Sequence, residues 1–224
     1  MAKKSNNTAA AWEKAKSTVK EHSEDLRALD SHGALYAWAK EHKLATTALF
    51  PKFKTELLKQ LGIDYNDLRE QAYAQRREQI AAAAADGPLV ELWTAADDEV
   101  NSFAICGPGG AVVTYNTFHD DDKTYRSGDQ DSADRSVAEF AVFIAGKVRE
   151  ELDVEAARLT LHVLNHEVAA DDPGLTRSAL GAHVNVTIEI DQDNPAAEWC
   201  REPGYKSWRE TDLRTLVADE AVAS

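Results

Sequence analysis

The chain has 224 residues, of which 43% are hydrophobic and 29% charged, and its 11 Gly and 6 Pro are too few for a disordered or repetitive protein. The length favours one ordinary domain joined to a smaller module. The two cysteines lack metal-binding spacing, no run of about 18 apolar residues occurs, and no apolar segment follows the first lysines. These features argue against a disulfide scaffold, a membrane span and a secretory signal, so we expect a cytoplasmic protein.

Charge is unevenly distributed along the chain. Residues 1–85 hold 14 Lys and Arg against 11 Asp and Glu, whereas the rest of the chain holds 11 against 28, so the net charges are +3 and −17. This asymmetry is compatible with a first part that contacts DNA or RNA and a second part that repels them unless metal ions intervene. An ordinary solubilising surface would give the same counts.

The first part has the pattern of a small all-α helical domain. Its signals are, in chain order, helical composition over 9–30, Ser31 as an N-cap, a turn over 43–46, Pro51 at the start of a third helix, Gly62 at its end, and Asp64 as the cap of a fourth helix. The sequence Asp86-Gly87-Pro88 is a strong breaker. We therefore place this domain at residues 1–86 and the second domain at 87–224.

Helix, short turn and helix between Ser31 and Gly62 are compatible with a helix-turn-helix whose basic residues contact phosphates. The candidate nucleic-acid-binding residues are Lys52, Lys54, Lys59, Arg69, Arg76 and Arg77. A plain helical bundle or a protein-docking module has the same pattern, because lysine on a solvated helix face is ordinary. Binding of DNA or RNA and binding of a partner protein both remain open, and no membrane partner is expected.

After the breaker the pattern changes to period two with β-branched residues, which predicts strands. The expected elements are strands 89–94, 102–106 and 111–118, a charged loop 119–135, an amphipathic helix 137–152, a strand 159–164, a helix 175–182, a strand 184–190 and a final helix around 209–221. The glycine-rich turn 107–110 makes the second and third strands a hairpin, and the helical crossover makes the fourth strand a parallel neighbour. The sequence predicts an α/β domain with a mixed five-stranded sheet and flanking helices.

This order of elements, over residues 88–210, resembles the ribonuclease H fold. The similar segments are Val90-Glu91-Leu92-Trp93-Thr94 at the first strand, Ser136-Val137-Ala138-Glu139 at the start of the first helix, 179–184 before the last strand, and 194–200 after it. The resemblance implies a metal-dependent nuclease that cuts the RNA of RNA–DNA hybrids. Its chemistry uses four carboxylates around two cations, Mg²⁺ or Mn²⁺.

The acids depart from that family pattern. Ala95 and Ala96 stand where the first aspartate is expected, Asn165 stands at the end of the fourth strand, and Arg201 stands near the last acid. Only Glu139 matches, and Ser136-x-x-Glu139 also has the pattern of a capping box, which we favour.

A rearranged acidic site would use Asp97, Glu139, Glu167 and Glu198, with Asp97 and Glu139 as the metal ligands. Our leading hypothesis is instead a catalytically degraded ribonuclease H-like domain without a cofactor, in a protein that binds nucleic acid or a partner. The alternatives are an active nuclease with the rearranged site and an acidic protein–protein interaction module. Cys106 and Cys200 have the pattern of core residues rather than nucleophiles, and the loop 119–122 that of a solvated surface.

Overall fold

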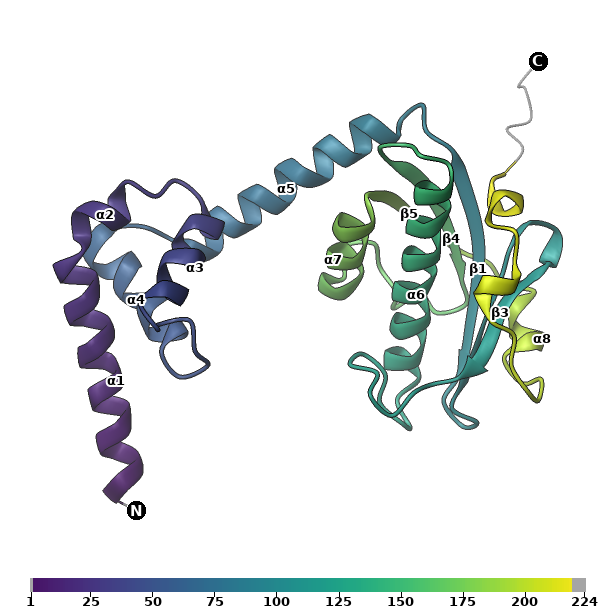
Figure 1. The fold of residues 1–224 in the computed structure, drawn as a ribbon. Helices are drawn as coiled ribbons and strands as arrows, with labels where there is room; N and C mark the ends of the chain where they lie inside the picture. The colour runs from purple at the N-terminus through teal and green to yellow at the C-terminus, as the bar shows by residue number, and fades with distance from the viewer. Residues whose placement is uncertain (1, 219–224) are drawn as a thin grey trace. The chain divides into compact units, whose positions relative to one another are not determined.

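The structure is a computed structural model that describes residues 2–218, and the chain divides into two compact units, Met1–Arg76 and Arg77–Ser224. Figure 1 shows a helical unit and an α/β unit. The division falls inside helix α5 (Tyr65–Ala84), and the change from helix to strand falls at the predicted breaker, between the end of α5 and the start of β1 at Leu89.

The helical unit contains the predicted helices with their predicted caps. Its elements are α1 (Ala2–Glu21), α2 (Ser23–Arg27), α3 (His32–Glu41), α4 (Phe50–Leu61) and the first part of α5. Ser31 accepts a hydrogen bond from the Ala34 amide, and Gly62 ends α4 in the left-handed conformation. Asp64 Oδ1 accepts from two amides of the first turn of α5.

Buried side chains from all these helices form one core, in which the largest residues are Phe53, Leu26, Leu35, Leu44 and Leu57. Leu58 of α4 lies outside this core and is 50% exposed. The connection between α3 and α4 runs from His42 to Leu49, eight residues, which is longer than the three- or four-residue turn of a helix-turn-helix.

The α/β unit is built on one mixed sheet in the order β3-β2-β1-β4-β5. Its strands are β1 (Leu89–Asp97), β2 (Ser102–Cys106), β3 (Val112–Thr117), β4 (Ala157–Val163) and β5 (Val184–Ile190). The β1–β2 and β2–β3 pairs are antiparallel, whereas β1–β4 and β4–β5 are parallel. The predicted hairpin and the predicted parallel crossover are therefore both confirmed.

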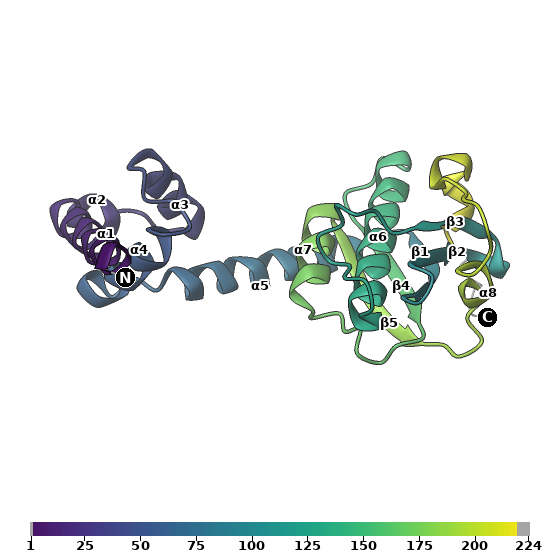
Figure 2. The same cartoon turned by 90° about the horizontal axis from the view of Figure 1, so that it is seen from below.

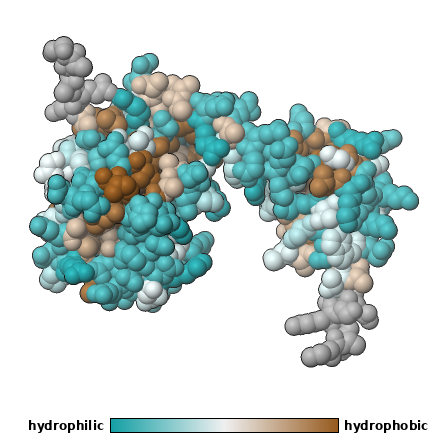
Figure 3. All heavy atoms as spheres, turned by 180° about the vertical axis from the view of Figure 1, so that it is seen from behind, coloured by the Kyte–Doolittle hydropathy of each residue, from teal (hydrophilic) through white to brown (hydrophobic). Residues whose placement is uncertain are grey.

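Helices α6 (Gln130–Glu151) and α7 (Pro173–Ala182) cover one face of the sheet, and the short helix α8 (Ala196–Trp199) lies on the other, as Figure 2 shows. The main core lies between the sheet and α6, where the apolar stripe of the helix packs on β1 and β4. Figure 3 shows a small apolar area on each unit within a mostly hydrophilic surface.

Three elements differ from the sequence prediction. Strand β1 continues to Asp97, because Ala95, Ala96 and Asp97 pair with β2. Helix α6 begins at Gln130, well before residue 137, because Asp129 caps it by accepting from the Ser132 amide.

The predicted final helix is absent from the described residues and is replaced by two 3₁₀ turns, η2 (Trp208–Glu210) and η3 (Leu213–Leu216). Bridges from Lys206 to Tyr115 and from Val217 to Val90 tie this segment to the sheet, so tertiary pairing prevails over local helix propensity. Residues 219–221 of the predicted helix lie outside the described range.

Candidate functional site

The sheet separates the two predicted metal ligands, Asp97 and Glu139. In β1, Leu92 packs in the core with α6, whereas Ala95 packs in a second cluster with Ala196 of α8. Side chains alternate between the faces of a strand, so Asp97 lies on the α8 side with Ala95. Glu139 belongs to α6 on the opposite side. The structure does not bring these carboxylates together, and they cannot bind the same pair of cations.

Asp97 is surrounded by hydrogen-bond donors. Its side chain is buried, its Oδ2 accepts from Arg201 Nε at 2.5 Å, and its Oδ1 accepts from the amides of Glu99 and Val100 at 3.0 and 3.3 Å. Arg201 occupies the place where the ribonuclease H resemblance expects an acid. The guanidinium therefore offsets the charge of Asp97, and the two amide hydrogen bonds close the turn after β1.

Glu139 does not cap its own helix. Because α6 begins at Gln130, Ser136 and Glu139 lie inside it, and Ser136 Oγ donates to Asp122 Oδ2 at 2.7 Å instead of accepting from an amide. The predicted capping box is therefore wrong, and the reason is the early start of the helix at its Asp129 cap.

The Glu139 carboxylate lies against the first turn of α7. Its Oε2 accepts from Thr124 Oγ1 at 3.2 Å, and a Cβ atom added to Gly174 would lie only 2.1 Å from its Oε1. Glycine at position 174 thus leaves the space that the carboxylate fills. Burial raises the pKa of Glu139, and the nearby Asp172 and Asp122 raise it further.

The other two predicted acids lie on the surface. Glu167 follows β4 in an exposed loop and pairs with His166 at 3.2 Å, and Glu198 is exposed on α8. Neither belongs to a shared acidic site with Asp97 or Glu139, so the predicted four-carboxylate constellation is not formed.

A different polar network forms where β1 and β4 end. Asn165, just after β4, donates through Nδ2 to Asp134 Oδ2 and to Asp131 Oδ1, both at 3.0 Å. Gln130 Nε2 donates to the same Asp134 oxygen and to the carbonyl of Ala96 in β1, also at 3.0 Å. Two side-chain amides from different elements therefore converge on one buried carboxylate.

The network carries net negative charge but offers a poor cation site. Burial raises the pKa of Asp134, and repulsion from Asp131 and Asp98 adds to the rise against the hydrogen bonds from Gln130 and Asn165. The amide N–H groups of Gln130 and Asn165 occupy Asp134 Oδ2, and a hard cation would have to displace them to bind that oxygen. Between residues 2 and 218, no group of three or more His, Cys, Asp or Glu is arranged to hold a metal ion.

The sequence missed this network for an identifiable reason. Asn165 stood out as a neutral residue at an expected acid position, but Gln130 and Asp134 were assigned to the charged loop before α6. An N-cap at Asp129 followed by an acid in the first turn is the signal that would have moved the helix start.

The thiols are core groups, as the sequence predicts. Cys106 and Cys200 are both buried, and burial raises the pKa of the Cys106 thiol to about 12 and also raises that of Cys200. A protonated, buried thiol is not a nucleophile.

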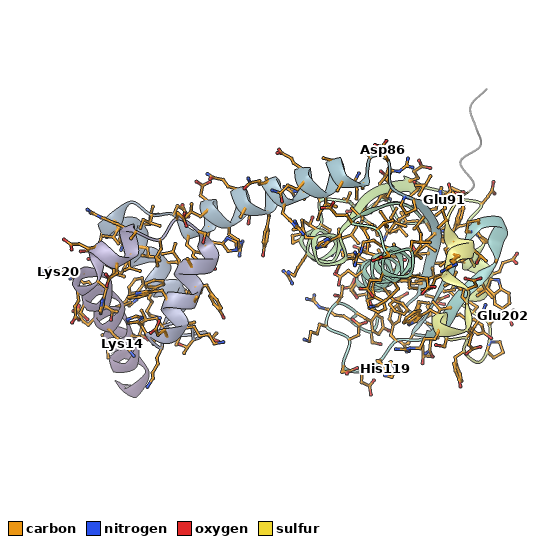
Figure 4. The ribbon with its side chains drawn as sticks, turned by 45° about the horizontal axis from the view of Figure 1, so that its top comes forward. Lys14, Lys20, Asp86, Glu91, His119 and Glu202 are labelled. Carbon is orange, nitrogen blue, oxygen red and sulfur yellow. The ribbon has the colours of Figure 1, made fainter. Side chains whose placement is uncertain are left out.

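The basic residues of α4 gather around an aromatic ring of α1. The ammonium groups of Lys52 and Lys59 lie 5.7 and 5.6 Å from the centroid of the Trp12 ring. Lysines seven residues apart share one helix face, so both cations flank the same indole. Figure 4 shows two further lysines, Lys14 and Lys20, on α1.

The remaining candidate cations are arranged differently. Lys54 donates to Asn66 Oδ1 at 3.0 Å and lies over the rings of Phe50 and Tyr65. Arg69 pairs with its neighbour Glu70 at 2.8 Å. Arg76 and Arg77 are exposed on α5 at the division between the units, so the six cations do not form one cluster within a single unit.

Comparisons with known proteins give no match to a family model, to a curated protein or to a solved structure. Over residues 2–218, no helix is both long enough and apolar enough to cross a lipid bilayer.

Proposed function

We propose that this chain is a non-catalytic protein built on a ribonuclease H-like scaffold, with a separate all-α domain that binds nucleic acid. The scaffold assignment is supported by the element order of the α/β unit, in which three antiparallel strands are followed by helix, strand, helix and strand. Short segments of sequence, among them 90–94 and 136–139, resemble the same family.

The observation that carries the non-catalytic assignment is the chemistry at the carboxyl ends of β1 and β4. There, Asp134 accepts hydrogen bonds from the side-chain amides of Gln130 and Asn165. On the other face of the sheet, Asp97 accepts a hydrogen bond from the guanidinium of Arg201. Two-cation hydrolysis needs carboxylate oxygens that are free to bind metal. Donors from the protein itself take the place of the cations, so the fold persists without the metal centre.

The nucleic-acid assignment is supported by the helical unit. The ammonium groups of Lys52 and Lys59 lie 5.7 and 5.6 Å from the centroid of the Trp12 ring. Residues 1–85 carry a net charge of +3, whereas the rest of the chain carries −17. Ammonium groups bind phosphates, and an adjacent indole offers a stacking surface for a base. The acidic unit repels phosphate, which confines the contact to the helical unit.

The test is a salt titration of the full chain against a fluorescein-labelled 20-mer, as duplex DNA and as an RNA–DNA hybrid. The double variant Lys52→Gln/Lys59→Gln should reduce the slope of log K against log salt by about 1.8, since each phosphate contact contributes about 0.9. Lys20→Gln/Lys40→Gln removes the same charge elsewhere on the unit and should change the slope by less than half as much.

Equal effects of the two double variants would show that binding is diffuse rather than located at Trp12. No salt-dependent binding by the parent chain would remove the nucleic-acid assignment and favour a protein partner.

The active-nuclease alternative has one observation in its favour, because Asp98 and Asp131 lie near enough to Asp134 to raise its pKa. Three acids that repel one another can bind a cation when the amides turn away. Hybrid cleavage by the parent chain that is lost in Asp134→Asn would establish this alternative.

A further inference from the structure

The α/β unit contains a cleft of about 810 Å³ that the proposed function does not use. It is bounded by α6, by the ends of β2 and β3 with the loop that follows, and by the segment before and within η2. Small-molecule sites are typically clefts of about 300–1,000 Å³ with apolar walls and a few polar groups. The volume of this cleft therefore suits a small organic ligand.

Aromatic rings form one continuous wall of the cleft. Phe103 contacts Phe118 and Phe140 at centroid distances of 5.0 and 5.7 Å, Phe140 contacts Phe143 at 5.9 Å, and Phe143 contacts Trp208 at 5.7 Å. The Phe143 side chain is 42% exposed although it is large and apolar. Such a wall offers ring faces and edges to a flat apolar group.

Three carboxylates also line the cleft. Glu139, Asp122 and Asp121 all contribute to the lining, and the loop that carries the two aspartates begins at His119, which Figure 4 labels. Glu139 is half-buried between Thr124 and the space left by Gly174. A carboxylate with reduced hydration gains more than an exposed one when a cation replaces the missing water.

We propose that this cleft binds a small organic cation, an amine joined to a flat apolar group. The rings accommodate the apolar part, and Glu139 with the two aspartates attracts the amine. The wall already accepts cations from the chain itself, since Arg209 lies 4.8 Å over Trp208 and Lys147 lies 5.4 Å over Phe143.

A phosphate-bearing ligand is disfavoured in this cleft. Three carboxylates line it, against Lys123 and Arg209 as the lining cations, and residues 86–224 carry a net charge of −17. Anions therefore meet repulsion both inside the cleft and on approach to it. The inference is independent of nucleic-acid binding by the helical unit.

The test uses calorimetric titration of the full chain with three probes of nearly equal size: 2-phenylethylamine, 2-phenylethanol and phenylacetate. The cationic amine should bind at least tenfold more tightly than the neutral alcohol, and the anion should bind more weakly still. Binding of the alcohol as tightly as the amine, tighter binding of the anion, or no binding of any probe would each overturn the proposal.

Three variants locate the site, each checked for its fold by circular dichroism. Glu139→Gln should weaken the amine about tenfold and leave the alcohol unchanged, whereas Phe143→Ala should weaken both probes. Glu155→Gln removes the same charge at an exposed position outside the cleft and should change neither. Amine binding that is unaffected by both Glu139→Gln and Phe143→Ala would place the site elsewhere and refute the assignment.

Discussion

Replacing Asn165 by Asp would restore the acid that the ribonuclease H resemblance expects after β4, and it tests the network at the carboxyl ends of the strands. Asn165 donates at 3.0 Å to the buried Asp134 and to the exposed Asp131. A hydrogen bond to a charged group contributes about 1.5–3 kcal/mol, and only the bond to buried Asp134 counts at that value. Asn165→Ala should therefore destabilise the α/β unit by about 1.5–3 kcal/mol.

Asn165→Asp loses the same donor and adds a negative charge beside Asp134. Even at the screening of bulk water, two charges about 4 Å apart repel by about 1 kcal/mol. At pH 7, Asn165→Asp should thus be at least about 1 kcal/mol less stable than Asn165→Ala. The difference should shrink as the pH falls, because Asp134, whose pKa is raised by burial, is protonated before an ordinary aspartate.

The assay is urea unfolding of the parent and both variants at pH 7 and pH 4, followed by tryptophan fluorescence, with Asn165→Ala as the control for the lost donor. Mg²⁺ should stabilise Asn165→Asp more than the parent, because the new carboxylate joins Asp131 and Asp134 while one of the two amides that donate to Asp134 is removed. Equal stability of the two variants at pH 7 would refute the role assigned to the Asn165 amide.

Three further predictions concern packing and charge. Gly174→Ala should destabilise the parent by about 1–2 kcal/mol in urea unfolding, because its Cβ would displace the Glu139 carboxylate. In a Glu139→Ala background the cost should be much smaller, since only the contact with Asp172 Oδ1 at 3.2 Å remains, and an equal cost in both backgrounds would contradict the contact with Glu139. The pKa of Asp134 in the folded state is raised above 3.8, so the stability that its protonated form contributes is present below that value and is lost as the pH rises through the folded pKa. The free energy of unfolding of the parent should therefore fall relative to that of Asp134→Asn over this rise, and parallel pH profiles of the two proteins would contradict the prediction. Gly146→Ala should lower stability by about 1–3 kcal/mol, because its Cβ would lie 2.9 Å from Ala182 Cβ where α6 meets α7, and a thermal midpoint at or above that of the parent would disprove this tight packing.

Much of the fold follows from local signals in the sequence. Ser31, Gly62 and Asp64 carry their cap roles in their own side chains or backbone freedom, so the helix ends they predict are confirmed. Alternation along β5 and the glycine-rich turn between β2 and β3 are equally local, and the strands they predict are confirmed.

The errors concern features set by distant parts of the chain. Ala95 and Ala96 have no strong strand preference, and pairing with β2 makes them strand. The segment 206–217 has helical composition, but its bridges to β3 and β1 hold it extended between short turns. Contacts with distant parts of the chain decide the structure of both segments, and the hydrophobic periodicity of the sequence does not reveal such contacts.

The predicted acidic site is not formed, and the reason is geometric. The prediction required Asp97 on the α6 side of the sheet, but alternation along β1, which ends at Asp97, places this side chain on the α8 side with Ala95. On that side Asp97 pairs with Arg201, which is 104 residues away in sequence. A pairing between residues so far apart leaves no signal in the sequence. Asn165, in contrast, was recognisable because it stands where the resemblance expects an acid, and it belongs to the polar network with Gln130 and Asp134.

We propose that the α/β unit, which resembles the ribonuclease H fold, does not catalyse hydrolysis of nucleic acid. The most direct test of this proposal is incubation of the full chain with a labelled RNA–DNA hybrid in Mg²⁺ or Mn²⁺, beside Asp134→Asn and Glu139→Gln. We predict no cleavage by any of the three proteins, although the parent binds the hybrid. Cation-dependent cleavage by the parent that disappears in Asp134→Asn would contradict the proposal that the α/β unit is not catalytic. It would place an active metal centre at the ends of β1 and β4.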